Sequence, residues 1–160
     1  MDHKGTQNQL FSIVQTVDTK ISPFFTEKLP ALPENIREVL AKIAPYLTIL
    51  GVVLGAFGIL AILGMIGVAS PAVVMYGGTG ATQAITGGII GAVFLGIQIL
   101  LQALAIPGLL KRQKNGWLFL FAASLVGLVF DLVSLNVFNL VVSFLISFYL
   151  LYQIKPYYKN

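Results

Sequence analysis

The chain contains no cysteine, one histidine and few charged residues. Without cysteine there are no disulfides, no thiolate metal sites and no cysteine nucleophile. The single histidine, His3, can form neither a multi-histidine metal site nor a catalytic triad. Charged residues make up 10% of the sequence, against about 25% in soluble domains, and 57% of the residues are hydrophobic. A soluble fold of 160 residues could not bury that much apolar surface, so the composition indicates a membrane protein.

All ten lysines and arginines lie outside four long apolar stretches: before residue 43, between residues 111 and 114, or after residue 154. This pattern predicts four transmembrane helices, at about residues 47–69, 86–110, 116–134 and 137–154. Pro71 should end the first of them. Because the loops at 71–85 and 135–137 contain no basic residue, the positive-inside rule predicts that both termini are cytoplasmic. It stays open whether residues 71–85 re-enter the membrane.

The region before the first predicted span should form two amphipathic helices that are too polar to cross a membrane. The first should cover about residues 6–21 and end before Pro23. Its apolar face contains Leu10, Val14, Val17 and Ile21 at helical spacing. The second should begin at Pro33, and Pro45 should bend the chain into the bilayer. We expect both helices on the cytoplasmic membrane surface or packed beneath the bundle.

Asp131 is the one ionisable side chain inside a predicted span. A carboxylate is unfavourable within a membrane, so such a residue is a candidate functional site. It lies about 22 Å along the helix from Gly116, near the outer surface. Two interpretations stay open: Asp131 serves an ion, a proton or a ligand, or it caps the following turn by bonding to Ser134, Asn136 or Asn139.

The fourth predicted span has a polar stripe on one face. Its members are spaced four residues apart: Asn139, Ser143 and Ser147. The third span has small residues at the same spacing, Ala123 and Gly127, and the short connection makes the two helices antiparallel neighbours. The stripe therefore indicates either hydrogen bonds between packed helices or a narrow polar track leading inward from Asp131.

Gln98 and Gln102 share a face of the second predicted span, close to the middle of the bilayer. Ser124 should lie at the same depth. An unpaired amide in hydrocarbon is unfavourable by several kcal/mol, so the glutamines should not face lipid. These groups indicate either an internal hydrogen-bonded cluster that stabilises the bundle or a binding site for a small polar molecule.

Two GxxxG pairs indicate close helix packing: Gly51 with Gly55, and Gly87 with Gly91. Small residues at this spacing let two helices approach each other, within one bundle or between protomers. The motif is common in membrane helices and does not identify the partner.

These patterns predict an all-α protein with an amphipathic region at residues 1–45 and a four-helix transmembrane bundle at residues 46–160. The segments LLKRQKNGWLFLF (residues 109–121) and YLLYQIK (residues 149–155) resemble small uncharacterised bacterial four-helix membrane proteins. The resemblance implies a bacterial inner-membrane protein. It identifies no catalytic or binding residue.

The sequence contains no catalytic constellation, so we expect a protein that is not an enzyme and needs no cofactor or metal. The favoured hypothesis is a scaffold or assembly subunit in the lipid bilayer that forms a homo-oligomer or docks another membrane-protein subunit. Two alternatives stay open: a small oligomeric channel or carrier lined by the polar residues above, and a binder of an apolar ligand such as a lipid or quinone. Nucleic acid is not expected, because the basic residues flank apolar spans.

Overall fold

The computed structural model describes residues 3–76, 79–135 and 137–159, which form five α-helices and a short 3-10 helix and contain no strand. In chain order the elements are α1 (His3–Glu27), α2 (Glu34–Tyr76), α3 (Thr79–Leu110), α4 (Lys114–Val133), α5 (Val137–Ile154) and η1 (Lys155–Tyr157). Helices α2 to α5 are each long and apolar enough to cross a membrane. The prediction of an all-α chain with four such helices is therefore confirmed.

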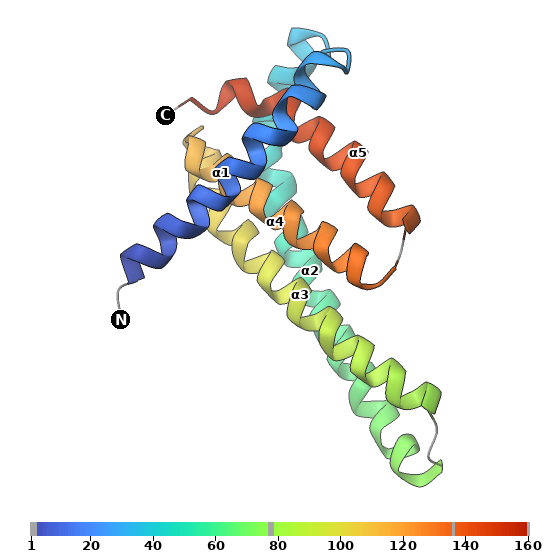
Figure 1. Cartoon of the computed structure of the whole chain (residues 1–160). Helices are drawn as coiled ribbons and strands as arrows, with labels where there is room; N and C mark the ends of the chain where they lie inside the picture. The colour runs from blue at the N-terminus through green and yellow to red at the C-terminus, as the bar shows by residue number, and fades with distance from the viewer. Residues whose placement is uncertain (1–2, 77–78, 136, 160) are drawn as a thin grey trace.

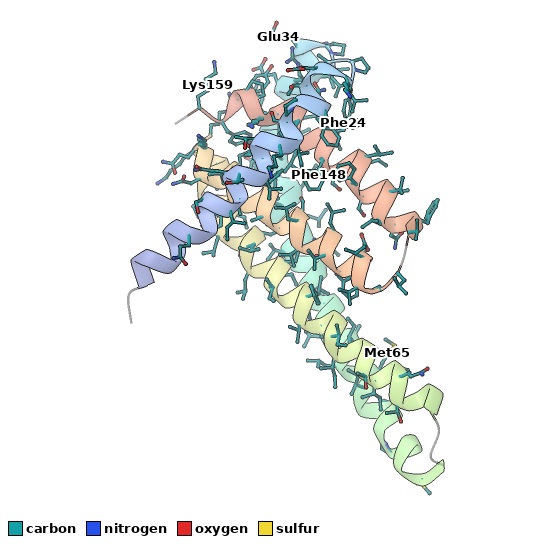
Figure 2. The ribbon with its side chains drawn as sticks, viewed as in Figure 1. Phe24, Glu34, Met65, Phe148 and Lys159 are labelled. Atoms are coloured by element: carbon teal, nitrogen blue, oxygen red, sulfur yellow. The ribbon has the colours of Figure 1, made fainter. Side chains whose placement is uncertain are left out.

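Helices α2 and α3 form a long antiparallel hairpin that extends past the turn between α4 and α5 (Figure 1). At 1.5 Å per residue, α2 is about 64 Å long and α4 about 30 Å. Near the end of α4, the Phe130 ring lies 3.6 Å from the position that a Cβ atom on Gly91 would take. Residues 63–76 and 79–90 lie beyond this level, and we term them the overhang. Met65 lies within it and is 66% exposed (Figure 2).

Helix α1 continues through Pro23, which lies inside it, for one more turn. The prediction that Pro23 ends this helix was therefore wrong. Proline removes one N–H donor and crowds the carbonyl four residues earlier, but side chains can satisfy the carbonyls left nearby.

Helix α2 likewise contains both Pro45 and Pro71. The prediction that Pro71 ends the first span was wrong, and the second N-terminal helix is continuous with that span. Membrane helices tolerate proline because neighbouring groups satisfy the freed carbonyl. The predicted loop at 71–85 is helical as far as Tyr76 and again from Thr79.

The core lies at the end of the molecule that carries the α3–α4 turn, which we term the basic end. Six aromatic rings meet there: Phe25, Trp117, Phe121, Phe144, Phe148 and Tyr152. Phe25 of α1 stacks on Tyr152 with 5.3 Å between ring centroids, and Phe148 lies where α1 crosses α5 (Figure 2). The Trp117 indole N–H donates to the Leu151 carbonyl oxygen at 2.9 Å, which joins α4 to α5.

Helix α1 is held on this core by polar contacts as well. The Asp18 carboxylate accepts hydrogen bonds from the Tyr152 hydroxyl at 2.9 Å and from Lys155 Nζ at 2.7 Å. Lys155 Nζ also lies 4.8 Å from the centroid of the Trp117 ring. From the apolar face predicted for this helix, three residues are partly buried against the core: Val14, Val17 and Ile21. The fourth, Leu10, has a side chain outside the described residues.

Candidate functional site

A cavity of about 230 Å³ lies between α3, α4 and α5, and we term it the Asp131 cavity. Its lining comprises Gln98 from α3, Ser124, Gly127, Leu128, Phe130 and Asp131 from α4, and Ser143 and Ser147 from α5. Five of the seven polar residues selected from the sequence therefore line one cavity. Helical periodicity accounts for this, because residues three or four apart point from the same face of a helix.

Gly127 opens the wall of the cavity toward α3. A Cβ atom at this position would lie 3.2 Å from Gln98 Nε2. The missing side chain therefore leaves room for the Gln98 amide between the two helices. Ala123, one turn earlier on α4, is 1% exposed and belongs to the packed part of that helix.

The Asp131 side chain is partly buried and makes no hydrogen bond or ion pair with any described residue. The alternative in which it caps the α4–α5 turn through Ser134 thus has no supporting contact. The Ser134 N–H instead donates to the Phe130 carbonyl oxygen at 2.9 Å. Asn136, another predicted partner, lies outside the described residues.

The remaining polar groups of the cavity are also largely unpaired. The Ser124 hydroxyl donates to the Leu120 carbonyl oxygen at 3.1 Å, as serines in helices commonly do. Within the described part of the chain, the side chains of Gln98, Ser143 and Ser147 have no hydrogen-bond partner. Unpaired polar groups among apolar helices are unfavourable by several kcal/mol, so the cavity requires water or a polar ligand.

Two of the predicted site residues are not brought to this cavity. Asn139 is exposed on α5. Gln102 meets α2 instead of α4, and its Oε1 lies 3.2 Å from the Cβ position of Gly51 on α2. It lines a separate cavity of about 300 Å³ together with Thr48 and mainly apolar residues. Because α3 lies between α2 and α4, glutamines only four residues apart contact different helices.

The glycines selected for packing differ in what they contact. Gly51 and Gly55 of α2 both face α3, where Gly55 comes so close that a Cβ atom would lie 2.8 Å from Ile99 Cδ1. Gly91 faces Phe130, as described above. Gly87 has nothing within 4 Å of its Cβ position, and the neighbouring Gly88 faces Ile66 instead.

The sequence analysis did not identify Gly108 as a packing residue, although its backbone meets that of Gly116 with no room for a methyl group. The available signal was the pair of glycines flanking the basic turn at residues 111–114. This contact fixes α4 against α3 and thereby sets the distance between Gln98 and the residues of α4.

The Asp131 cavity offers oxygen acceptors and one negative charge, and no lysine or arginine lines it. Among the described residues, no group of three or more His, Cys, Asp or Glu could hold a metal ion together. Comparison with protein-family models, curated proteins and solved structures finds no significant match. The function must therefore be argued from the geometry.

Proposed function

We propose that this chain is a multi-pass protein of the bacterial inner membrane that takes up a small cation in the Asp131 cavity, as a subunit of a channel or carrier. The observation that carries this proposal is the set of unpaired acceptors around one carboxylate. Carboxylate, hydroxyl and amide oxygens together suit a cation, and no basic side chain competes for Asp131. The volume of about 230 Å³ suits a small solute such as a hydrated monovalent ion or a primary amine.

The orientation proposed for this function has both termini in the cytoplasm. All ten basic residues lie before residue 43, in the α3–α4 turn or at the first residue of α4, or after α5. In this orientation Asp131, two residues before the end of α4, faces the outer leaflet. The cavity would then receive its solute from outside, and Ser143 and Ser147 continue it toward the basic end along α5.

Substitution of Asp131 by asparagine tests the proposal, because it removes the charge and keeps the shape. Proteoliposomes that contain the wild type should take up K⁺, Na⁺ or methylammonium. D131N should slow that uptake about tenfold or more. A hydrogen bond to a charged group contributes about 1.5–3 kcal/mol, and about 1.4 kcal/mol corresponds to a factor of ten. The matched control is E27Q, which removes an exposed carboxylate at the end of α1. Uptake that is absent in the wild type, or equal in D131N and wild type, would overturn the proposal.

A scaffold subunit is the second candidate, and the overhang supports it. Four exposed glycines there have nothing within 4 Å of their Cβ positions: Gly64, Gly67, Gly80 and Gly87. The surface therefore admits another helix at close range. Native mass spectrometry in lipid nanodiscs should then show a defined oligomer that G87L disrupts. A strict monomer that crosslinks to no other protein in cells would exclude this candidate.

A further inference from the structure

A groove of about 340 Å³ lies at the basic end, between the start of α2 and the end of α3. Its buried floor includes Ala41 and Leu109, which are 2% and 1% exposed. Two cationic side chains, Lys42 and Arg112, line its rim. We term it the Arg112 groove. It is separate from the Asp131 cavity and shares no residue with it.

Arg112 is held at the groove by an uncommon backbone conformation. Its φ is +52°, a left-handed value that residues other than glycine adopt infrequently. Its N–H donates to the Leu109 carbonyl oxygen at 3.1 Å, and the following Gln113 N–H donates to Gly108 at 2.7 Å. Such conformations persist where surrounding contacts hold them, and they are often found at functional sites.

The guanidinium of Arg112 makes no ion pair or hydrogen bond with the described residues. Its positive charge nevertheless acts on Tyr158 at this end of the molecule. Burial raises the pKa of the Tyr158 hydroxyl, and the charge of Arg112 partly offsets that rise. Tyr158 in turn donates to the Ala41 carbonyl oxygen at 3.0 Å, beside the groove floor. The five N–H donors of Arg112 are therefore free for an external acceptor.

Lys42 carries the second charge. It pairs with Glu38 one turn earlier at 2.8 Å, but both side chains are about half exposed, at 58% and 48%. Exposed pairs of this kind contribute little free energy and exchange readily. The ammonium group has three donors, so one carboxylate does not saturate it.

We propose that the Arg112 groove binds the headgroup of an anionic phospholipid, with the phosphodiester held by Arg112 and Lys42. Basic grooves between membrane helices suit such headgroups, and guanidinium groups match phosphate oxygens in geometry. An apolar path for the acyl chains leads away from the groove along one face of α2. Its members are spaced three or four residues apart and are 46–66% exposed: Tyr46, Leu50, Val53 and Phe57. This inference needs only that α2 and α3 lie in a membrane, and it is independent of cation uptake.

Native mass spectrometry of the full chain, released from phosphatidylcholine nanodiscs that contain a few per cent phosphatidylglycerol, tests this site. The wild type should retain one phosphatidylglycerol molecule. Loss of one basic side chain, in R112Q or K42Q, should weaken retention about fivefold, and the double variant should weaken it about thirtyfold. E38Q should strengthen retention, because it removes the carboxylate that competes for Lys42. That gain cannot arise from misfolding.

The matched control is the double variant K111Q/K114Q, which removes two exposed charges from the same turn that do not line the groove. Equal losses in the control and in R112Q/K42Q would show non-specific attraction to the membrane and overturn the proposal. A second arm uses inorganic phosphate alone, which lacks acyl chains. Phosphate that binds as tightly as the lipid and displaces it would assign the groove to free phosphate and overturn the lipid assignment.

Discussion

Gly108 at the end of α3 and Gly116 at the start of α4 lie in direct backbone contact. A Cβ atom on Gly108 would lie 2.5 Å from Gly116 Cα and 2.6 Å from Gly116 N. Because the atoms in the way belong to the backbone, no rotamer change could relieve the clash. The tight turn between the two helices therefore depends on glycine at both positions.

Replacing Gly116 by alanine should lower the stability of the protein by about 1–3 kcal/mol, as overpacking in closely packed sites does. Thermal unfolding in detergent, followed by Trp117 fluorescence, would measure the change. G87A is the control, since a methyl group at Gly87 meets nothing within 4 Å. It should leave stability unchanged or slightly raised. Equal melting temperatures for the two variants would contradict the contact.

Replacing Asp18 by asparagine should release α1 from the basic end. Asp18 and Lys155 have side chains only 11% and 30% exposed, and Tyr152 shares the same carboxylate. Removing one partner leaves a poorly solvated ammonium, so we expect a loss of about 2–3 kcal/mol. Faster amide hydrogen exchange throughout α1 would show the release.

The exposed pair of Glu38 and Lys42 provides the comparison for that experiment. Its net contribution should be about 0.3–0.5 kcal/mol, the usual value for exposed pairs on a helix. E38Q should therefore leave exchange in α1 unaltered. If D18N speeds amide exchange in α1 no more than E38Q does, then aromatic packing alone holds α1 on the core.

The sequence was sufficient to predict the four apolar helices, because long uncharged runs have few alternatives. It also indicated several residues of the Asp131 cavity, because Ser143 and Ser147 stand four apart and must share a helix face. The separation of Gln98 from Gln102 could not be predicted. Which neighbour each amide meets depends on the helices flanking α3, and residue spacing does not specify those.

The attachment of α1 to the basic end could not be predicted from the sequence for a similar reason. The contact between Asp18 and Lys155 joins residues 137 positions apart, and no local pattern distinguishes Asp18 from any other polar residue of an amphipathic helix. The helix ends at Pro23 and Pro71 were misjudged because proline disfavours a helix interior but does not forbid it when nearby groups satisfy the freed carbonyl.

Replacing Leu135 by asparagine or glycine should stabilise the turn between α4 and α5. Leu135 has φ of +52° and is 82% exposed, so it adopts a left-handed conformation without packing that would offset the strain. Left-handed backbone is unfavourable by about 1–2 kcal/mol for an ordinary residue, and asparagine or glycine adopts it more easily. The melting temperature should therefore rise in both variants. V137A changes the next described residue, which does not have a positive φ, and serves as the control; it should not raise the melting temperature.

Replacing Gly127 by leucine should fill the Asp131 cavity without removing any of its polar groups. The Cβ position meets only the end of the Gln98 side chain, at 3.2 Å from Nε2, and that end can move. We therefore expect a loss of stability of no more than about 1–3 kcal/mol, as for other insertions into packed sites. Cation uptake in proteoliposomes should fall to the level of D131N, whereas A56L, which enlarges an exposed side chain of α2 outside the overhang, should retain it. Normal uptake by G127L would mean that the cation does not occupy this cavity, even if Asp131 proved necessary for transport.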